Sequence, residues 1–266
     1  MWTESSEVAW NKRYGEEAPR IDPVHAQFML HRSVRHFAED LLSKETVQSL
    51  IACAQSASTS SNLQLYSIIS VADPGRRAQL AELCANQAHV LRAPLFLAFF
   101  ADHYRVKQAG TAVGEQCSGL DYNEFYAMAV IDASLAAERL VCAAEASGLG
   151  VCYIGALRNN PQGVADFFEL PPGVVGLFGL CVGVPAINKD ASLKPRIGQS
   201  SVYFEEKYRS SGLGDYDLRM SKFYDQEGMK GDVTWSMRSG RRVGESFLTG
   251  REALLPFLHK QGMDSR

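Results

Sequence analysis

The sequence predicts an α+β protein with one central sheet. Its 266 residues are 46% hydrophobic, which is enough to bury a substantial core. Two long apolar runs, "APLFLAFFAD" (93–102) and "VVGLFGLCVGVP" (174–185), are typical of buried strands. Helical patterns interleave with the strands, but several connections lack the regular spacing of βαβ units, which argues against a doubly wound parallel sheet.

The N-terminal part begins with an extension, residues 1–20, that precedes a single predicted domain over 21–266. We expect the extension to be flexible or loosely docked. Asp22 followed by Pro23 is the pattern of an N-cap and a first helical residue, and it predicts a helix that ends near His31.

A second helix is expected over 43–57, where apolar residues repeat at the spacing of one helix face and Ser43 can cap the N-terminus. Residues 64–73 are expected to form a strand that stops at a Pro-Gly pair. A further helix should occupy about 75–85, and the buried strand over 93–102 follows it.

The middle of the chain contains a long predicted helix over 122–147. A looser, glycine-containing stretch precedes it, and Gly148 ends it. This helix is apolar almost all round, so it belongs in a core or at a subunit interface. A strand over 150–158, a helix near 161–168 and the strand over 174–185 complete the sheet region.

The C-terminal part is more polar. It predicts an aromatic-rich helix around 201–224 and a last helix over 250–260 that contains Pro256.

Composition excludes several classes of protein. The net charge of −3 argues against a general nucleic-acid binder, because such a protein has a basic excess. No apolar run is long enough to span a membrane, and the polar N-terminus lacks the apolar core of a secretory signal. The six cysteines form no CxxC pair, so we expect free thiols in a reducing cytoplasm and no metal site.

Common catalytic motifs are also absent. The sequence contains no GxGxxG after a strand, no GxxxxGK[ST], no HExxH and no GxSxG. No side chain is therefore indicated as a nucleophile, and we expect a cofactor to carry any chemistry.

Four polar segments end predicted helices or strands. The first cationic segment, "HRSVR" (31–35), and the second cationic segment, "KPR" (194–196), offer groups that bind a phosphate. The hydroxyl-rich turn, "SASTSSNLQ" (56–64), can donate hydrogen bonds to a polar ring edge. The platform segment, "YIGA" (153–156), contains a glycine that lets backbone approach a flat ligand.

Each segment also has a purely structural interpretation, as a surface turn, a solvated loop or an ordinary strand end. Together the four segments fit flavin mononucleotide (FMN), which requires cations for its phosphate, donors for its pyrimidine edge and close backbone packing on its ring.

The motifs also resemble, in order, those of the FMN-dependent oxygen-insensitive nitroreductases, and most closely the NADPH-preferring nitroreductase and flavin reductase subgroup. The resemblance runs from about residue 25 to the C-terminus. It is densest at "HRSVRHF", "SSNLQ", "NQAHV", "GLGVCYIGALRNN", "LFGLCVG", "LKPR" and "LHKQG".

The resemblance implies a central, mostly antiparallel sheet flanked by helices and an interlocked homodimer with two FMN molecules at its interface. It implies ping-pong catalysis, in which NADPH or NADH gives a hydride to flavin N5 and an oxidant then takes two electrons. Nitroaromatics, quinones and free flavins are the implied oxidants, and no side chain is assigned as catalytic. It implies neither a metal, nor a nucleic acid, nor a membrane partner.

The resemblance also assigns residues. The phosphate and ribityl end of FMN would contact His31, Arg32, Ser33 and Arg35, with Lys194 and Arg196 on the other side. The ring or ribityl hydroxyls would contact Thr59, Ser61, Gln87 and His89, and the ring would pack along Tyr153, Ile154, Gly155 and Ala156. The substrate would contact Ser61, Asn62, Lys230 and Arg251.

Several positions depart from the relatives. Gln226 and Gly231 replace arginines of the loop that holds the 2′-phosphate of NADPH, and Lys230 is the cation nearby. Either NADPH or NADH is therefore expected as donor. Asn62 replaces an aromatic residue beside the flavin, and Leu248 stands where a lysine is expected.

Three alternatives to a nitro and quinone reductase remain open at this stage. The chain could be an NAD(P)H:flavin oxidoreductase that supplies reduced FMN to a partner. It could be a non-catalytic flavin-binding module, or a domain whose basic turns are only surface. The physiological oxidant and the role of residues 1–20 are not indicated.

Overall fold

The computed structural model describes residues 4–186, 191–229, 231, 233–263 and 266. The chain forms two compact units, each made of two stretches of sequence. Unit 1 comprises residues 1–32 and 191–248, and unit 2 comprises residues 33–190 and 249–266. Because Ala191–Leu248 returns to pack with the N-terminal stretch, unit 1 is built from sequence on both sides of unit 2.

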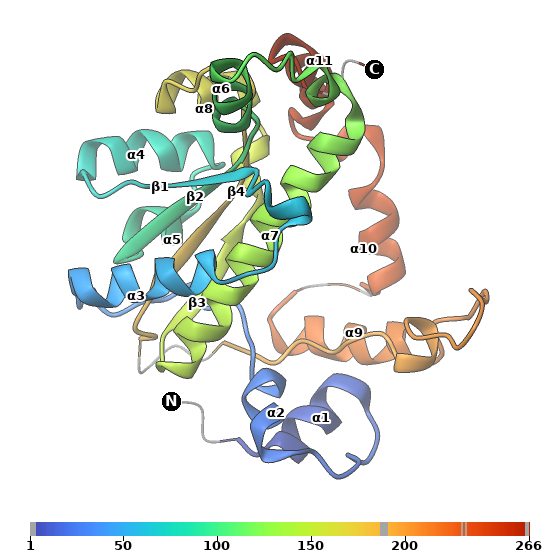
Figure 1. Ribbon diagram of the computed structural model, residues 1–266. Coiled ribbons are helices and arrows are strands. Elements are labelled where there is room, and N and C mark those ends of the chain that lie inside the picture. Colours follow the sequence, from blue (N-terminus) through green and yellow to red (C-terminus); the bar gives the residue numbers. More distant parts are fainter. Residues whose placement is uncertain (1–3, 187–190, 230, 232, 264–265) are drawn as a thin grey trace. The chain divides into compact units, whose positions relative to one another are not determined.

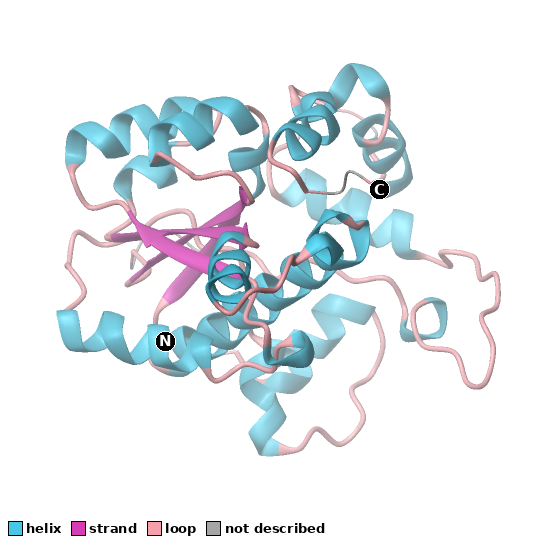
Figure 2. Ribbon diagram, turned by 45° about the horizontal axis from the view of Figure 1, so that its top comes forward, coloured by secondary structure: helices cyan, strands magenta, loops and turns pink. Residues whose placement is uncertain are grey.

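Unit 2 is built on a sheet of β1 (Tyr66–Ser70), β2 (Leu95–Asp102), β3 (Gly150–Ile154) and β4 (Val174–Gly183). The strand order is β1-β2-β4-β3, and the pairings between these four strands are antiparallel. An isolated bridge between Ser33 and Val151 is parallel. Figure 2 shows the strands in magenta with helices around them. The α+β class with a mostly antiparallel central sheet is thus confirmed. Each of the four strands lies within a range that the sequence predicted.

The two faces of the sheet are covered by different helices (Figure 1). Alternate residues of β2 point to opposite faces, as the pleat requires. Leu97 and Phe99 pack with α3 (Lys44–Gln55) and α7 (Asn123–Ala146). Phe96 and Phe100 pack with α4 (Pro74–Leu83), α5 (Ala88–Arg92) and α8 (Pro161–Phe168). Burial on both faces explains why β2 is a continuous apolar run.

Helix α7 is the long apolar helix that the sequence predicted. One face is fully buried against the sheet through small residues such as Ala133, Ala136 and Ala137, so the helix packs closely. On its other side Ile131 is 50% exposed and Leu135 is 44% exposed. The helix therefore contributes to the core and also presents apolar side chains on the surface of the single chain.

The predicted helix starts are correct where a capping side chain is present. The side chain of Asp22 accepts a hydrogen bond from the Val24 amide at the start of α2 (Pro23–Met29). Ser43 caps α3 in the same way through the Thr46 amide. Such caps satisfy amide groups that the helix itself leaves without a partner.

Four helices were not predicted: α1 (Ser6–Tyr14), α5, α6 (Tyr104–Ala112) and α10 (Trp235–Arg242). The N-terminal stretch contains a helix, because α1 is capped by Ser5 and ended by Gly15 in the left-handed conformation. The glycines between 103 and 121 suggested a loop, yet Gly110 lies inside α6. The division of the chain at residue 20 stays a prediction.

The helix expected around 201–224 is wrong in its first half. Helix α9 spans only Tyr216–Gln226, and the residues before it include η4 (Gln199–Ser201) and Gly214 with a φ of +55°. A left-handed glycine is unfavourable inside a helix, so the helix begins after it. The last helix, α11 (Leu254–Lys260), keeps Pro256 in its first turn, where no intrahelical amide bond is lost.

Candidate functional site

In unit 2, residues 33–38 run beside the sheet and continue its hydrogen bonding. The Val34 amide donates to the Val151 carbonyl (2.8 Å), and the Ala38 amide donates to the Val184 carbonyl (2.8 Å). Val34 is buried, and Phe37 packs against the core, so both anchor this stretch to unit 2. Arg35 between them is exposed.

In unit 1, Arg32 is only 7% exposed. Its guanidinium already bonds other groups of the protein. Nε donates to the Leu30 carbonyl (3.1 Å) and Nη1 donates to the Ala191 carbonyl (3.2 Å). Nη2 pairs with the carboxylate of Glu4. Arg32 therefore joins the first cationic segment to the stretch that leads into the second, and its predicted contact with phosphate stays a prediction.

The second cationic segment is extended, with alternating burial. Leu193 and Pro195 are buried, whereas Lys194 and Arg196 are exposed. The buried residues anchor the backbone, and the Pro195 carbonyl accepts a hydrogen bond from the Tyr216 hydroxyl (3.4 Å). Side chains two positions apart in an extended chain point to the same side. Lys194 and Arg196 therefore lie on the same surface of the segment.

Arg13 of α1 is a residue that the sequence analysis missed. Its side chain donates to the carbonyls of Met29 (3.0 Å) and His31 (2.7 Å). Its own carbonyl accepts from the Arg196 amide (2.7 Å). Nothing in the sequence marked Arg13, because its partners are backbone groups that a sequence does not reveal.

The hydroxyl-rich turn, in unit 2, is attached to α7 by Asp132. Oδ1 accepts from the Ser60 amide (2.8 Å) and Oδ2 accepts from the Leu65 amide (3.0 Å). Asp132 is fully buried, so its charge must be stabilised by such bonds. This residue too was missed; the signal available was one acidic residue at a core position of an apolar helix.

The same turn has an unusual backbone. Ser61, Asn62 and Gln64 all have positive φ values, of 49°, 56° and 53°. Left-handed backbone is unfavourable for residues other than glycine, and it persists only where the surroundings enforce it. The two bonds to Asp132 span this stretch, and they leave Ser61 and Asn62 exposed.

The platform segment, also in unit 2, ends β3. The side chains of Ile154 and Ala156 are buried in the core on the face of the sheet that α4, α5 and α8 cover. Only the backbone of these two residues can therefore contact a ligand. Tyr153 points to the other face, where its hydroxyl donates to the carboxylate of Glu138 (3.1 Å). Burial raises the pKa of the Tyr153 phenol, and the nearby charge of Glu138 raises it further.

Gly155 lies between two arginines. A Cβ atom there would be 3.5 Å from Nη2 of Arg158 and 3.8 Å from Nη2 of Arg251. Arg251 also donates to the Gly155 carbonyl (3.1 Å). Arg251, expected to face the substrate, is thus brought to the platform segment, together with Arg158, which the sequence analysis did not single out.

Gln87 and His89 lie at the start of α5. Burial lowers the pKa of His89, and the charges of Arg35 and His36 lower it further. A lowered pKa keeps the imidazole neutral at pH 7, able both to donate and to accept a hydrogen bond.

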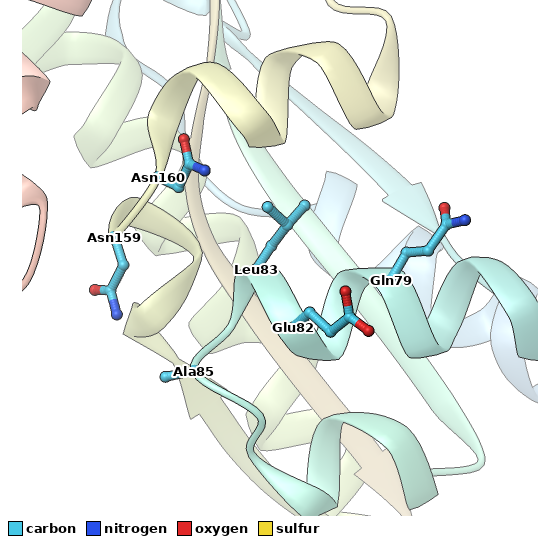
Figure 3. Close-up of a pocket in the computed structure, with 6 residues that line it drawn as sticks. All are labelled: Gln79, Glu82, Leu83, Ala85, Asn159 and Asn160. Atoms are coloured by element: carbon cyan, nitrogen blue, oxygen red, sulfur yellow. The ribbon is translucent and has the colours of Figure 1, made fainter.

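A pocket of about 490 Å³ opens between the end of α4 and the residues after β3 (Figure 3). Its lining residues are Gln79, Glu82, Leu83, Ala85, Asn159 and Asn160. The Asn159 side-chain oxygen is buried without a hydrogen-bond partner. None of the lining residues belongs to the predicted set, although Asn159 and Asn160 directly follow η3 (Gly155–Arg158).

The remaining predicted residues are distributed between the units. His31, Arg32, Lys194 and Arg196 belong to unit 1, whereas Ser33, Arg35, the hydroxyl-rich turn, the platform segment and Arg251 belong to unit 2. Lys230 lies outside the described residues. No helix in the described part of the chain is long and apolar enough to cross a membrane.

These features suit a flavin. Gly155 has no side chain of its own, so the backbone there can lie close to a flat, electron-poor ring, with two guanidinium groups beside it. The exposed Lys194 and Arg196 can accept a phosphate. The antiparallel α+β fold and the backbone platform after β3 fit a protein that positions a flat cofactor and lets the cofactor do the chemistry.

Comparison with known proteins gives the family. The model of the nitroreductase family matches residues 29–184, and the model of the C-terminal domain of that family matches residues 194–266. The chain belongs to the nitroreductase family. Membership confirms the resemblance seen in the sequence and the predicted enzyme class, an FMN-dependent NAD(P)H oxidoreductase.

Individual relatives agree. The chain is 40% identical to an FMN reductase (NADPH) from Bacillus subtilis, over 77% of this chain and 85% of that protein. It is 36% identical to an oxygen-insensitive NADPH nitroreductase from Salmonella typhimurium, over 89% of this chain and 96% of that one. A solved nitroreductase structure from B. subtilis superposes with a TM-score of 0.83 at 36% identity, over 90% of this chain and 98% of that one.

Proposed function

We propose that this protein binds FMN and uses NADPH or NADH to reduce nitroaromatics and quinones by two electrons. When bound, FMN accepts a hydride from the nicotinamide and passes two electrons to the oxidant. The observation that carries the proposal is the platform at Gly155, which has no side chain of its own and has the guanidinium groups of Arg158 and Arg251 beside it.

The protein's own groups have defined tasks in this proposal. The platform segment supports the ring through backbone atoms, because the side chains of Ile154 and Ala156 are buried. The guanidinium groups of Arg158 and Arg251 stabilise negative charge at the ring edge. His31, Arg32, Ser33 and Arg35 with Lys194 and Arg196 hold the phosphate, and Thr59, Ser61, Gln87 and His89 bond the polar edge or the ribityl hydroxyls.

The oxidant would bind next to Ser61 and Asn62 of the hydroxyl-rich turn, both exposed. The side-chain amide of Asn62 makes this part of the proposed binding site polar. Lys230 and Arg251 complete the proposed substrate contacts.

NADPH is the donor for which the relatives are named. Gln226 and Gly231 stand where the loop that holds the 2′-phosphate has arginines in the relatives. Helix α10 follows this loop directly and supplies three exposed arginines, Arg238, Arg241 and Arg242. We therefore expect a preference for NADPH that these arginines support, and measurable use of NADH.

Flavin reduction is a second candidate function. A relative from B. subtilis is named an FMN reductase and one from Vibrio harveyi an NADPH-flavin oxidoreductase, the latter 34% identical over 90% of this chain. On this alternative, free FMN is the oxidant and reduced FMN is released to a partner enzyme.

Steady-state kinetics of the purified protein test these proposals. Rates are measured with NADPH and with NADH, each against nitrofurazone, a benzoquinone and free FMN. Parallel double-reciprocal lines and a bound yellow flavin are expected. A protein that binds no FMN would refute the proposal, and turnover confined to free FMN would favour flavin reduction.

The proposed assembly is a homodimer in the cytoplasm. Exposed Ile131 and Leu135 on the otherwise buried α7 are the support for a subunit interface. All six cysteines are free, which fits a reducing compartment.

A further inference from the structure

Helix α1 carries a buried arginine outside the matched family regions, which begin at residue 29. Arg13 is 5% exposed although it is the last but one residue of a short surface helix. Arginine is rarely buried unless its donors are satisfied. Its burial therefore needs a specific explanation, and its partners supply one.

The first group of partners is the backbone that leads into Arg32. Nε of Arg13 donates to the Met29 carbonyl (3.0 Å), and Nη2 donates to the His31 carbonyl (2.7 Å). The planar guanidinium can reach two carbonyls at once because its donors diverge in a fixed geometry. These two bonds fix the backbone on which His31 and Arg32 are carried.

The second group is the backbone of the second cationic segment and of α9. The Arg13 carbonyl accepts from the Arg196 amide (2.7 Å) and from Nη1 of Arg219 (2.7 Å). Nη1 of Arg219 also donates to the Arg196 carbonyl (3.2 Å). Arg196 is thus held through both its amide and its carbonyl, while its side chain stays exposed.

A single residue therefore joins two stretches that are far apart in the sequence, and both stretches carry cations proposed for the FMN phosphate. Without such a connection, binding would have to order both stretches, and that cost would reduce affinity. Like-charged side chains such as Arg32 and Arg196 also tend to separate unless the backbone holds them.

We propose that Arg13 is a positioning residue that holds the two cationic segments together for the phosphate of FMN. The N-terminal helix of this chain is then part of its cofactor site. This inference rests on the proposed function, because it assumes that the two segments bind the phosphate.

Glu4 strengthens the attachment. Its carboxylate pairs with both Lys12 of α1 and Arg32 of the first cationic segment. The Arg32 guanidinium also donates to the carbonyls of Leu30 and Ala191, so this arginine is attached to both stretches of unit 1.

The test compares FMN with riboflavin, which has the same ring but no phosphate. Flavin-free, full-length protein is titrated with each ligand, and quenching of flavin fluorescence gives the two dissociation constants. The variants are Arg13→Met, which removes all donors, and Arg13→Lys, which keeps the charge but cannot reach both carbonyls. Arg20→Met is the matched control, since Arg20 is an exposed arginine of the same N-terminal stretch.

We expect Arg13→Met to weaken FMN by about tenfold or more and riboflavin by less than about twofold, because only the ordered phosphate contacts are lost. Arg13→Lys should be intermediate, and Arg20→Met should match the wild type. If Arg13→Met does not fold, the ratio of the FMN and riboflavin dissociation constants of Arg13→Lys decides the question.

An unchanged ratio of the FMN and riboflavin dissociation constants in Arg13→Met and Arg13→Lys would overturn the inference. The ratio stays unchanged if neither ligand binds more weakly, or if both weaken equally through general damage. A wild type that binds FMN no better than riboflavin would instead refute the proposed phosphate site itself, and the inference with it.

Discussion

At the scale of single residues, the candidate site depends on buried polar groups that do not touch the ligand in the proposal. Asp132 and Arg13 are both buried and charged, and each bonds backbone groups of a predicted ligand-binding segment. A polar group buried in this way costs free energy unless it is paired, so its partners are part of the explanation of the site.

Asp132→Ala tests the attachment of the hydroxyl-rich turn. It leaves the buried Leu65 amide without an acceptor, which should lower the free energy of unfolding by about 1–3 kcal/mol. Asp132→Asn keeps one acceptor oxygen and should lose less. Urea denaturation followed by circular dichroism measures both values, and equal stability of Asp132→Ala and wild type would contradict the role of this carboxylate.

His89 predicts a dependence of stability on pH. Its pKa is lowered in the folded protein, so below the ordinary value of about 6.5 the unfolded chain binds a proton that the folded one does not. Stability should therefore fall as the pH drops through about 6.5 towards the lower folded pKa. His89→Gln should show a smaller fall between pH 7.5 and pH 5.5 in urea titrations, with His25→Gln on α2 as control. If the stability of His89→Gln fell as steeply with pH as that of the wild type, the predicted role of His89 would be refuted.

At the scale of elements, close packing of the sheet depends on a glycine in β4. A Cβ atom at Gly179 would lie 2.3 Å from Cζ of Phe96 on β2. No real Cβ tolerates that distance, so either the ring or the strand has to move.

Gly179→Ala should therefore reduce stability by about 1–3 kcal/mol, the usual cost of overpacking a core. Adding Phe96→Leu removes the clashing atom, so the double variant should lose less than the sum of the two single losses. Thermal and urea unfolding of all four proteins measure the cycle. Additive losses would mean that the alanine methyl does not meet Phe96.

At the scale of the whole molecule, the exposed apolar face of α7 predicts self-association. Ile131 and Leu135 lie one helical turn apart and are half exposed on a helix whose other side is core. Light scattering should give a mass of about twice 29.3 kDa for the wild type. The double variant Ile131→Glu, Leu135→Glu should give one chain mass, whereas Val113→Glu, at an exposed apolar position beside α6, should not change it. A monomeric wild type would refute the homodimer.

Much of the fold was predictable from the sequence because the signals are local. Apolar runs identified the strands, and Asp22 and Ser43 identified helix starts through caps that lie within three residues. The misses have equally physical causes. Helix α6 contains Gly110, which suggested a loop, and residues 201–215 include Gly214 in the left-handed conformation, after which α9 begins.

The sequence by itself determined the α+β class, the long apolar helix, the family, and the four segments that carry the proposed ligands. Only the tertiary structure decided which residues hold those segments in place. Arg13, Asp132 and Arg251 bond backbone carbonyls and amides far away in the chain. Backbone groups are the same at every position, so no sequence pattern records these bonds, and they exist only once the chain has folded.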